Sequence, residues 1–544
     1  MAKVSFKHQP GSSPELFPVN IFDKIPQNHP SRLVNTVVDS LDLTAVINKY
    51  IGGGCSAYHP RMMVKVLFYS YLSNIYSCRK IARALTENIH FMFLAGNLTP
   101  DFRTINDFRA KILKDSIKEL FSEVVKLLVE MGYVSLDVQY IDGTKIEATS
   151  NKYTFVWKKS VEKYKGKLED KVRSVLADIE SCIASDNEET PVPPLPGTFN
   201  TDGLRKKLSE INSRLKAPTK QQEKELQKLG EEHLPKLESY QKKLETLGCR
   251  NSYSKTDTDA TFMRMKEDHM KNGQLKAGYN PQISTENQFI THVSIHQKPN
   301  DTTTLETHLN GFRQAYGKQS KEVVADAGYG SHENYKMMET KEIDAYIKYN
   351  YFHKEQKKKA KDDPFSVANM YYNPSLDYYV CPMGQKLLRC GASIRKSENG
   401  FESEMSHYKA QNCNNCPMRG MCHDSKDDRV ITVNHELNRY KAQARELLTS
   451  PKGLRHRHKR PIEVEAVFGQ LKSNNKFNRF TFRGLDKVEM EFLLMSIGHN
   501  FRKMVAKGLS CLNYSVTVNG KCFYILLKHQ NERFYHDIFC NLYK

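Results

Sequence analysis

The sequence predicts a mixed α/β protein, with a central sheet interrupted by two insertions and preceded by an all-helical N-terminal domain. Apolar residues recur every three or four positions through residues 30–131, which is the period of a helix. Short β-rich runs stand on both sides of a Lys- and Glu-rich helical stretch, residues 155–250. Five of the 12 cysteines fall between residues 381 and 422, which marks the second insertion.

Composition narrows the class of protein. The 544 residues contain 82 Lys and Arg against 62 Asp and Glu, a net charge of +20. This excess favours a polyanionic partner, first nucleic acid and second a membrane surface. A hydrophobic content of 39% excludes a disordered chain. We expect no membrane span, no secretory signal and no nucleotide cofactor, because the corresponding patterns are absent. The scattered cysteines fit a reducing compartment such as the cytoplasm.

The chain divides into seven predicted segments by composition and period. They are an N-terminal helical DNA-binding domain (1–131), two parts of the core (132–154 and 251–354), a coiled-coil-like arm between them (155–250), a cysteine-rich insertion (355–430), a C-terminal helical part of the core (431–510) and a tail (511–544).

Two short helices around Gly96–Leu98 resemble a helix-turn-helix, a motif that places its second helix in the DNA major groove. On that second helix, Arg103 and Arg109 would face DNA. The alternative is a plain helical bundle with a charged solvent face.

The core elements follow a change of period. Residues 138–141 read as a strand that turns at Gly143. After the arm, the order is strand, strand, helix, strand, helix, strand, through residues 282–348. This order predicts a mixed sheet assembled from distant parts of the chain. The arm itself has three apolar helical stripes separated by a proline-rich break at 190–197. Its alternative role is packing alone.

The cysteine-rich insertion contains Cys413-Asn-Asn-Cys416, a spacing typical of a metal knuckle. Cys381 and Cys422 would complete a tetrahedral four-sulfur set that resembles a zinc ribbon, and Cys390 or His423 could substitute. Because the insertion is short and has few large apolar residues besides tyrosine, we expect it to need a staple. Such a zinc ion would be structural, since four thiolates leave no open position. The alternative is reduced thiols.

Three acidic residues are candidates for a catalytic metal site. Asp142 and Asp326 each follow an apolar strand, and Glu465 lies on a helix after the basic run 455–460. Carboxylates that converge above a sheet repel each other unless a cation compensates them. Hard oxygen ligands suit Mg²⁺ or Mn²⁺, and two such ions would clamp the oxygens of an in-line phosphoryl displacement.

The segments around these acids resemble the three acidic motifs of DDE transposases. They are Tyr140-Ile-Asp-Gly-Thr-Lys-Ile-Glu-Ala148, Val324-Ala-Asp-Ala-Gly-Tyr-Gly330 and Ile462-Glu-Val-Glu-Ala-Val-Phe-Gly-Gln-Leu-Lys472. The closest group is the bacterial insertion-sequence transposases of the IS1182 type, within the IS4/IS5 assemblage. Residues 59–109 are similar to the helical N-terminal domain of that family, and the family also carries a cysteine-rich insertion.

The resemblance implies an RNase H-like core whose catalytic, metal-binding triad is Asp142, Asp326 and Glu465. Glu465 and Lys472 are seven residues apart, on one face of a regular helix, so Lys472 could contact a phosphate. Glu463 competes with Glu465, but residues two apart point to nearly opposite faces. Relatives carry a Tyr and an Arg before the Glu. Here Arg460 fills the Arg role, and no Tyr matches.

The basic run that contains Arg457 and Arg460 has two interpretations, phosphate contact or a solvated helix start, and we favour phosphate contact. The resemblance implies a transposase that binds terminal inverted repeats and catalyses metal-dependent DNA cleavage and strand transfer. It would act as a homodimer on double-stranded DNA in the bacterial cytoplasm, associated with the nucleoid. Two alternatives are an inactive or domesticated DNA-binding repressor and an RNase H-like nuclease without strand transfer.

Overall fold

The computed structural model describes residues 20–50, 56–187, 201–214, 219–265, 273–397, 399–518 and 521–529. The chain forms two compact units. The first contains residues 1–136, 285–292 and 490–544, and the second contains residues 137–284 and 293–489. No helix in these described ranges is long and apolar enough to cross a membrane.

The N-terminal part of the first unit is helical, as the sequence predicts. Its helices are α1 (Pro30–Ser40), α2 (Thr44–Ile47), α3 (Pro60–Leu72), α4 (Cys78–Glu87), α5 (Ile89–Ala95), α6 (Phe102–Asp107) and α7 (Ile117–Glu130), with short turns η1 (Ile21–Lys24), η2 (Phe108–Ile112) and η3 (Leu113–Asp115). Helix α5 ends at Gly96, whose φ of 57° suits glycine. Helix α6 begins at Asp101, whose side chain accepts the Thr104 backbone N–H. The two short helices around the break are therefore confirmed as elements.

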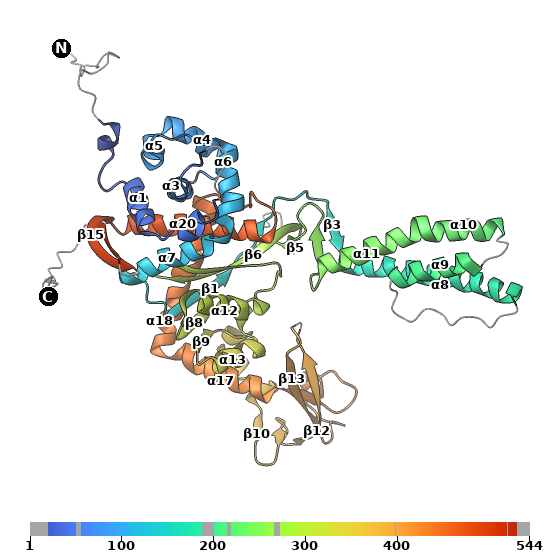
Figure 1. Cartoon of the computed structure of the whole chain (residues 1–544). Coiled ribbons are helices and arrows are strands. Elements are labelled where there is room, and N and C mark those ends of the chain that lie inside the picture. Colours follow the sequence, from blue (N-terminus) through green and yellow to red (C-terminus); the bar gives the residue numbers. More distant parts are fainter. Residues whose placement is uncertain are drawn as a thin grey trace, which may run out of the picture. The chain divides into compact units, whose positions relative to one another are not determined.

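The second unit is built on a mixed sheet, which confirms the predicted α/β class (Figure 1). Its strands are β1 (Val138–Gly143), β2 (Ile146–Glu147), β5 (Thr261–Arg264), β6 (Leu275–Glu286), β7 (Phe289–His296), β8 (Glu322–Ala325) and β9 (Asp344–Ile347). The order is β2-β6-β1-β8-β9, and β5 and β7 also pair with β6. The tip of the β6–β7 hairpin, residues 285–292, counts with the first unit.

Strands β1, β8 and β9 are parallel neighbours. A parallel pair needs a crossover connection. The helix α13 (His332–Thr340) supplies it between β8 and β9, and α12 (Leu305–Tyr316), after the short turn η5 (Asp301–Thr303), precedes β8. Because parallel strands end at the same edge, the residues that follow β1, β8 and β9 come together.

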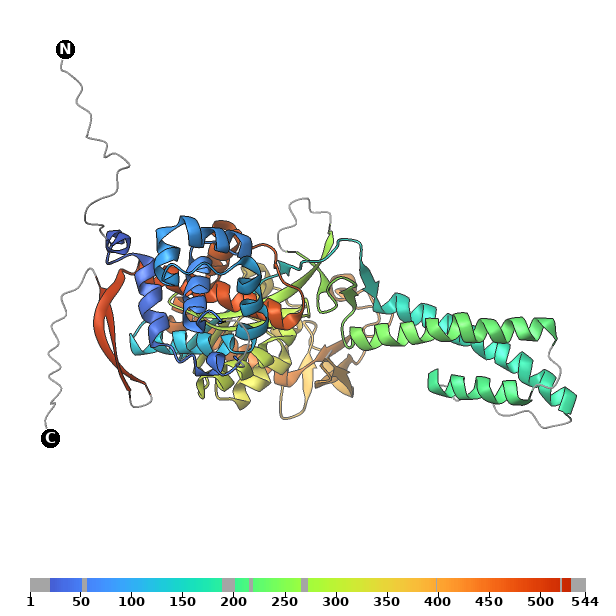
Figure 2. The same ribbon diagram turned by 45° about the horizontal axis from the view of Figure 1, so that its top comes forward.

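The arm is helical, as predicted, and it packs around its own apolar core. A short pair, β3 (Phe155–Trp157) and β4 (Ser252–Ser254), stands at its base. Its helices are α8 (Lys158–Asn187), α9 (Thr201–Arg214), α10 (Lys220–Lys228), η4 (Leu229–His233) and α11 (Leu234–Leu247). Figure 2 shows α8, α9 and α11 side by side, and their buried core is Val172, Leu176, Ile179, Leu204, Leu208, Ile211, Leu229 and Leu237. The proline-rich break at 190–197 lies outside the described residues.

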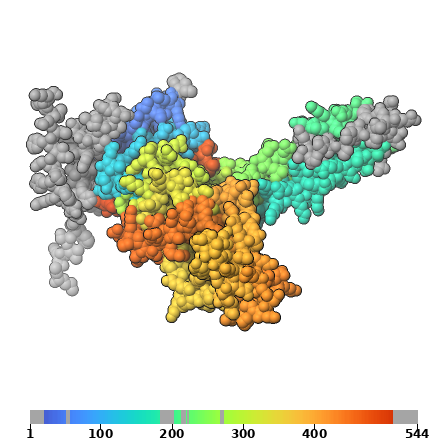
Figure 3. All heavy atoms as spheres, turned by 90° about the horizontal axis from the view of Figure 1, so that it is seen from below, coloured from blue at the N-terminus to red at the C-terminus, as the bar shows by residue number. Residues whose placement is uncertain are grey.

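The cysteine-rich insertion is a five-stranded antiparallel sheet, which Figure 3 shows as a lobe in orange. Its elements are α14 (Phe352–Glu355), α15 (Lys358–Lys361), η7 (Val367–Asn369), β10 (Tyr371–Asn373), β11 (Tyr378–Val380), β12 (Lys386–Lys396), β13 (Glu402–Ala410), α16 (Arg419–Cys422) and β14 (Val430–Val433). It has an apolar core of Met370, Tyr379, Leu387, Tyr408, Ala410, Ile431 and Val433. Strand pairing thus gathers apolar and tyrosine side chains that are scattered in the sequence, and whether the insertion also needs a metal stays a prediction.

Helices resume after this sheet with α17 (His435–Thr449) and α18 (Pro451–Arg460). From Pro451 to Asn474 the backbone stays helical, through the π-helical turn η8 (Pro461–Glu465), α19 (Ala466–Gly469) and a second π-helical turn, η9 (Gln470–Asn474). Helix α20 (Leu485–Ala506) follows, and β15 (Leu509–Val518) pairs antiparallel with β16 (Lys521–His529).

Candidate active site

The edge of the sheet where β1, β8 and β9 end carries three charged residues in a row. Ile141 pairs with Ala325 at the end of β1 and β8, so Asp142 and Asp326 are the next residues of adjacent parallel strands. Ala325 pairs with Ile347 at the end of β9, so Lys348 follows at the same edge. The strand register therefore brings the two predicted aspartates together and adds a lysine that the sequence analysis did not single out.

Glu465 is linked to Asp142 at this edge by Arg460, which contacts both carboxylates. One guanidinium nitrogen of Arg460 donates to Glu465 Oε1 at 2.8 Å, and the other lies 3.4 Å from Asp142 Oδ2. The Arg460 side chain is buried, whereas the Glu465 side chain is 55% exposed. A single buried cation thus neutralises an acid from β1 and an acid from the helix, and charge-assisted contacts of this kind fix geometry as well as charge.

Asp326 interacts electrostatically with side chains that also respond to Asp142 or Glu465. Burial lowers the pKa of Lys348, while Asp326 and Glu465 act to raise it and Arg460 acts to lower it. Burial also raises the pKa of the Tyr329 hydroxyl, with Asp142 and Asp326 adding to the effect. Each predicted acid therefore lies within electrostatic reach of groups that also respond to another of the three.

A fourth carboxylate, Asp301, lies beside these acids. Its Oδ1 accepts hydrogen bonds from Asn280 Nδ2 at 2.8 Å and Gln282 Nε2 at 2.9 Å. The Tyr329 hydroxyl donates to the oxygen of the same Gln282 side chain. A Cβ atom added at Gly143 would collide with Gln282 Nε2 and stand 2.8 Å from Asp301 Oδ1. Sequence reasoning missed Asp301 because an acid in a turn before a helix looks like an ordinary cap.

The two glutamates of the third motif have different surroundings. Glu463 is buried and forms an ion pair with Lys459 at 3.2 Å. Lys472 is also buried, and its ammonium donates to the Lys145 backbone carbonyl at 3.0 Å. In this structure Lys472 thus contacts the segment between β1 and β2. The expectation that Lys472 shares a face with Glu465 assumed a regular helix, and the π-helical turns η8 and η9 interrupt that period.

The two arginines predicted to face DNA in the N-terminal helices differ in exposure. Arg103 is exposed and lies over the Phe102 ring. Arg109 is only 4% exposed and donates to the Tyr71 hydroxyl at 2.9 Å and the Tyr76 carbonyl at 3.0 Å. The expectation of an exposed Arg109 is therefore wrong. The π-helical turn η2 begins at Phe108 and changes the direction in which the next side chains project.

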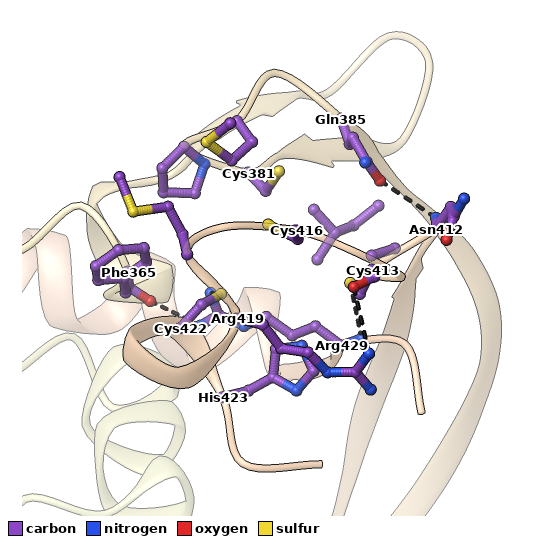
Figure 4. Close-up of a pocket in the computed structure, with 15 residues that line it drawn as sticks. Phe365, Cys381, Gln385, Asn412, Cys413, Cys416, Arg419, Cys422, His423 and Arg429 are labelled. Atoms are coloured by element: carbon purple, nitrogen blue, oxygen red, sulfur yellow. Dashed lines mark hydrogen bonds between the residues drawn. The ribbon is translucent and has the colours of Figure 1, made fainter. Parts of the chain in front are cut away.

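Four cysteines of the second insertion line one cavity of about 30 Å³ (Figure 4). They are the four predicted as zinc ligands, Cys381, Cys413, Cys416 and Cys422. Two tight turns present three of them, with the Gly384 N–H donating to the Cys381 carbonyl and the Cys416 N–H donating to the Cys413 carbonyl. Cys422 is the last residue of α16. All four are free thiols.

Of the two alternative ligands considered, only one lies at this cavity. His423 lines it, and both ring nitrogens are buried without a hydrogen-bond partner. Cys390 is exposed on β12 and donates to the His407 carbonyl at 3.5 Å. Arg429 contacts two of the sulfurs, through its backbone N–H to Cys413 at 3.4 Å and its guanidinium to Cys422 at 2.9 Å. Across the described residues, no group of three or more His, Cys, Asp or Glu stands in an arrangement ready to hold a metal ion.

Two family models match the chain. A Transposase domain (DUF772) matches residues 19–111, which include α1 to α6. A Transposase DDE domain matches residues 380–505, from the end of β11 through Glu465 into α20. A search of curated proteins finds no match.

These two matches indicate a DDE transposase. The order of the two domains is the arrangement of the IS1182 type. Asp142 and Asp326 lie outside both matched ranges, so the strand register carries the argument for them.

Proposed function

We propose that this transposase cuts DNA at the ends of an insertion sequence and joins them to target DNA, with Asp142, Asp326 and Glu465 as its catalytic acids. The observation that carries the proposal is the pairing of β1 with β8, whose last pair lies one residue before both aspartates, together with Arg460, which contacts Asp142 and Glu465. The order β7-β6-β1-β8-β9, with its last three strands parallel, supports an RNase H-like core.

The chemistry of the three acids suits divalent metal ions. Three carboxylates supply hard oxygen donors, and because Arg460 is one cation facing two of them, a further cation would be favoured. Asp142, Asp326 and Glu465 would hold Mg²⁺ or Mn²⁺. Two such ions, when bound, would supply Lewis-acid stabilisation to the attacking and leaving oxygens of an in-line displacement. The protein would contribute position and charge, with no covalent enzyme intermediate.

The reaction consists of two displacements at phosphorus. Water first attacks a phosphodiester at the element end and releases a 3′-OH. This 3′-OH then attacks a phosphodiester of target DNA, so that one bond forms and one breaks. The helices of the N-terminal domain, with exposed Arg103, would bind the terminal inverted repeats. Because two ends must be cut together, we propose a homodimer on DNA, acting in the bacterial cytoplasm at the nucleoid.

The experiment uses the full chain, a duplex bearing the element ends, and Mg²⁺. We expect Asp142→Asn, Asp326→Asn and Glu465→Gln to abolish cleavage while DNA binding is kept. Glu446→Gln, which changes an exposed acid on α17, is the matched control and should cleave like the wild type. Cleavage retained by the three variants would overturn the triad.

The same assay separates the alternatives. Cut ends without a joined product would indicate a nuclease without strand transfer. Binding of the ends by the wild type with no cleavage in Mg²⁺ or Mn²⁺ would indicate a repressor.

For the cysteine-lined cavity we propose a structural zinc ion held by Cys381, Cys413, Cys416 and Cys422. Their shared cavity supports this, and so does the cationic Arg429 beside two sulfurs, because positive charge favours thiolates. We expect metal analysis to find one zinc per chain, lost in Cys413→Ser and kept in Cys390→Ser. Purified protein without zinc would contradict the assignment.

A further inference from the structure

The geometry points to a DNA-binding surface that the sequence analysis did not assign, formed by residues 348–361 and called here the lysine segment. We propose that its lysines bind DNA phosphates next to the candidate acids and that its exposed Tyr351 stacks on a base. This rests on the proposed function in one respect, that the neighbouring acids act on DNA, and it extends that function by naming where the substrate lies.

The lysine segment begins at the site itself. Lys348 follows β9 at the level where Asp326 follows β8. The connections after these two strands are packed against each other, since a Cβ at Gly330 would collide with the Lys348 carbonyl and stand 3.0 Å from Tyr349 Cα. Further along, burial lowers the pKa of His353, with Lys348 and Arg457 adding to the effect and Asp326 opposing it. A DNA phosphate that reached Asp326 would therefore lie close to the start of this segment.

Its charge is strongly positive and largely unbalanced. The segment contains six lysines and a single acid, Glu355. That acid is already occupied, because it accepts hydrogen bonds from Arg445 at 2.9 Å and from the Tyr349 hydroxyl at 2.8 Å. Four lysines at the far end are exposed, and within the described part of the chain no ion pair joins them to a carboxylate: Lys357, Lys358, Lys359 and Lys361. Two further acids, Asp362 and Asp363, follow directly.

The segment is anchored. Phe352 is buried, and the Arg457 guanidinium lies 5.2 Å from its ring centre. At the other end, Asn369 Nδ2 donates to the carbonyls of Ala360 and Asp363, each at 2.8 Å. The backbone between these two anchors therefore presents its lysines from a fixed position. Exposed lysines on an anchored segment attract the phosphates of a nucleic acid, and binding is favoured by release of condensed counterions.

Tyr351 distinguishes this surface from an ordinary solvated face. It is 69% exposed, and its φ of 72° lies in the left-handed region that non-glycine residues rarely adopt. Lys354 lies 5.4 Å from its ring centre. An exposed aromatic ring among lysines is the combination with which proteins hold unpaired nucleotides, because every base has a face on which such a ring can stack. Backbone strain of this kind is found at functional sites.

The first test measures phosphate contacts without catalysis. Affinity for a labelled DNA duplex is measured by fluorescence anisotropy over a range of KCl, without divalent metal, for the wild type and for K357A/K358A/K359A. The control, K220A/K224A/K228A, removes the same charge from exposed positions on α10 of the arm. The slope of log K against log salt is negative, and each lost phosphate contact reduces its magnitude by about 0.9.

We therefore expect the lysine-segment variant to reduce that magnitude by about two to three and the affinity at least tenfold, while the control changes affinity by less than twofold. Equal behaviour of the two triple variants would overturn the proposal. Circular dichroism melting confirms that both variants are folded.

The second test isolates Tyr351. Affinity is compared for a blunt duplex and for a duplex with a single-stranded 3′ end, using Tyr351→Ala and Tyr351→Phe. We expect Tyr351→Ala to lose about fivefold or more on the tailed duplex only, and Tyr351→Phe to match the wild type, because the ring is kept. Equal binding of the tailed duplex by Tyr351→Ala and the wild type would overturn the stacking role.

Neither test depends on cleavage. A wild-type protein that binds DNA through the lysine segment but never cuts it would refute the proposed function and leave this surface intact.

Discussion

A guanidinium nitrogen of Arg460 lies 3.4 Å from a carboxylate oxygen of Asp142, while the other donates to Glu465. We predict that Arg460→Gln destabilises the metal-free protein, because the two acids lose the cation that compensates them. Since Glu465 is 55% exposed, solvent screens part of the effect, and we expect a loss of about 2 kcal/mol. Thermal or urea denaturation measures it.

The same variant should recover stability when Mg²⁺ is added, because a bound ion would replace the lost charge. Arg455→Gln, at an exposed position of the same helix α18, is the matched control and should show neither effect. A variant that stays destabilised at saturating Mg²⁺ would argue against metal binding at these acids.

Gly143 packs so closely against Gln282 and Asp301 that a side chain at this position would collide with them. We predict that Gly143→Ala costs about 1–3 kcal/mol, because the added methyl group collides with Gln282 and lies against Asp301. The variant should also displace Asp142 and cleave the DNA duplex more slowly than the wild type in the Mg²⁺ assay. Gly469→Ala is the control, since a Cβ there has no neighbour within 4 Å and alanine favours a helix by about 1 kcal/mol. Equal stability of the two variants would contradict the crowding at Gly143.

We predict different effects for substitution of the exposed Arg103 and of the buried Arg109. Arg103→Ala should weaken binding of the inverted repeats and leave the melting temperature unchanged, because its side chain is exposed. Arg109→Ala should destabilise the protein by about 1–3 kcal/mol, since the buried Tyr71 hydroxyl and the Tyr76 carbonyl lose their donor. Binding and melting measured on both variants check this. An unchanged melting temperature in Arg109→Ala would be the contrary result.

His499 predicts a pH dependence of stability. It is fully buried in α20, donates to the Gln288 carbonyl at 2.8 Å, and burial lowers its pKa from 6.5 to about 4. In the unfolded chain the imidazole of His499 is protonated below about pH 6.5, whereas in the folded chain it is protonated only below about pH 4. Stability should be full above pH 6.5 and fall toward pH 4 by up to about 1.4 kcal/mol per pH unit.

Urea midpoints between pH 4 and 7.5 measure this slope. His499→Gln keeps a donor for Gln288 but does not titrate, so its slope should be shallower by that amount. If both proteins have the same slope, His499 is not the group responsible.

Much of the fold could be predicted from sequence because its signals are local. The strand at 138–141, the Gly96 break and the alternation of strands and helices after the arm each follow from residue types within a few positions. The choice of Glu465 over Glu463 assumed a regular helix and stays a prediction, although Glu463 is buried and forms an ion pair with Lys459.

The features of the site that could not be predicted from sequence depend on strand register and on irregular helical turns. Lys348 and Asp301 join the site through strand pairing and through amides from β6, which no local pattern records. Arg109 was misjudged because a π-helical turn changes helical phase without a mark in the sequence, and a similar turn leaves the face of Lys472 untested. The apolar core under the cysteines is likewise a product of pairing between distant strands.

The parallel pairing of β1 with β8 joins two strands that are separated by the whole arm, and Glu465 comes only after the cysteine-bearing sheet. A chain leaving the ribosome N-terminus first therefore exposes Asp142 long before either of its acidic companions has been synthesised. If the three acids cut DNA together, every prematurely terminated product that stops before residue 465 lacks the third of them and should be unable to cut.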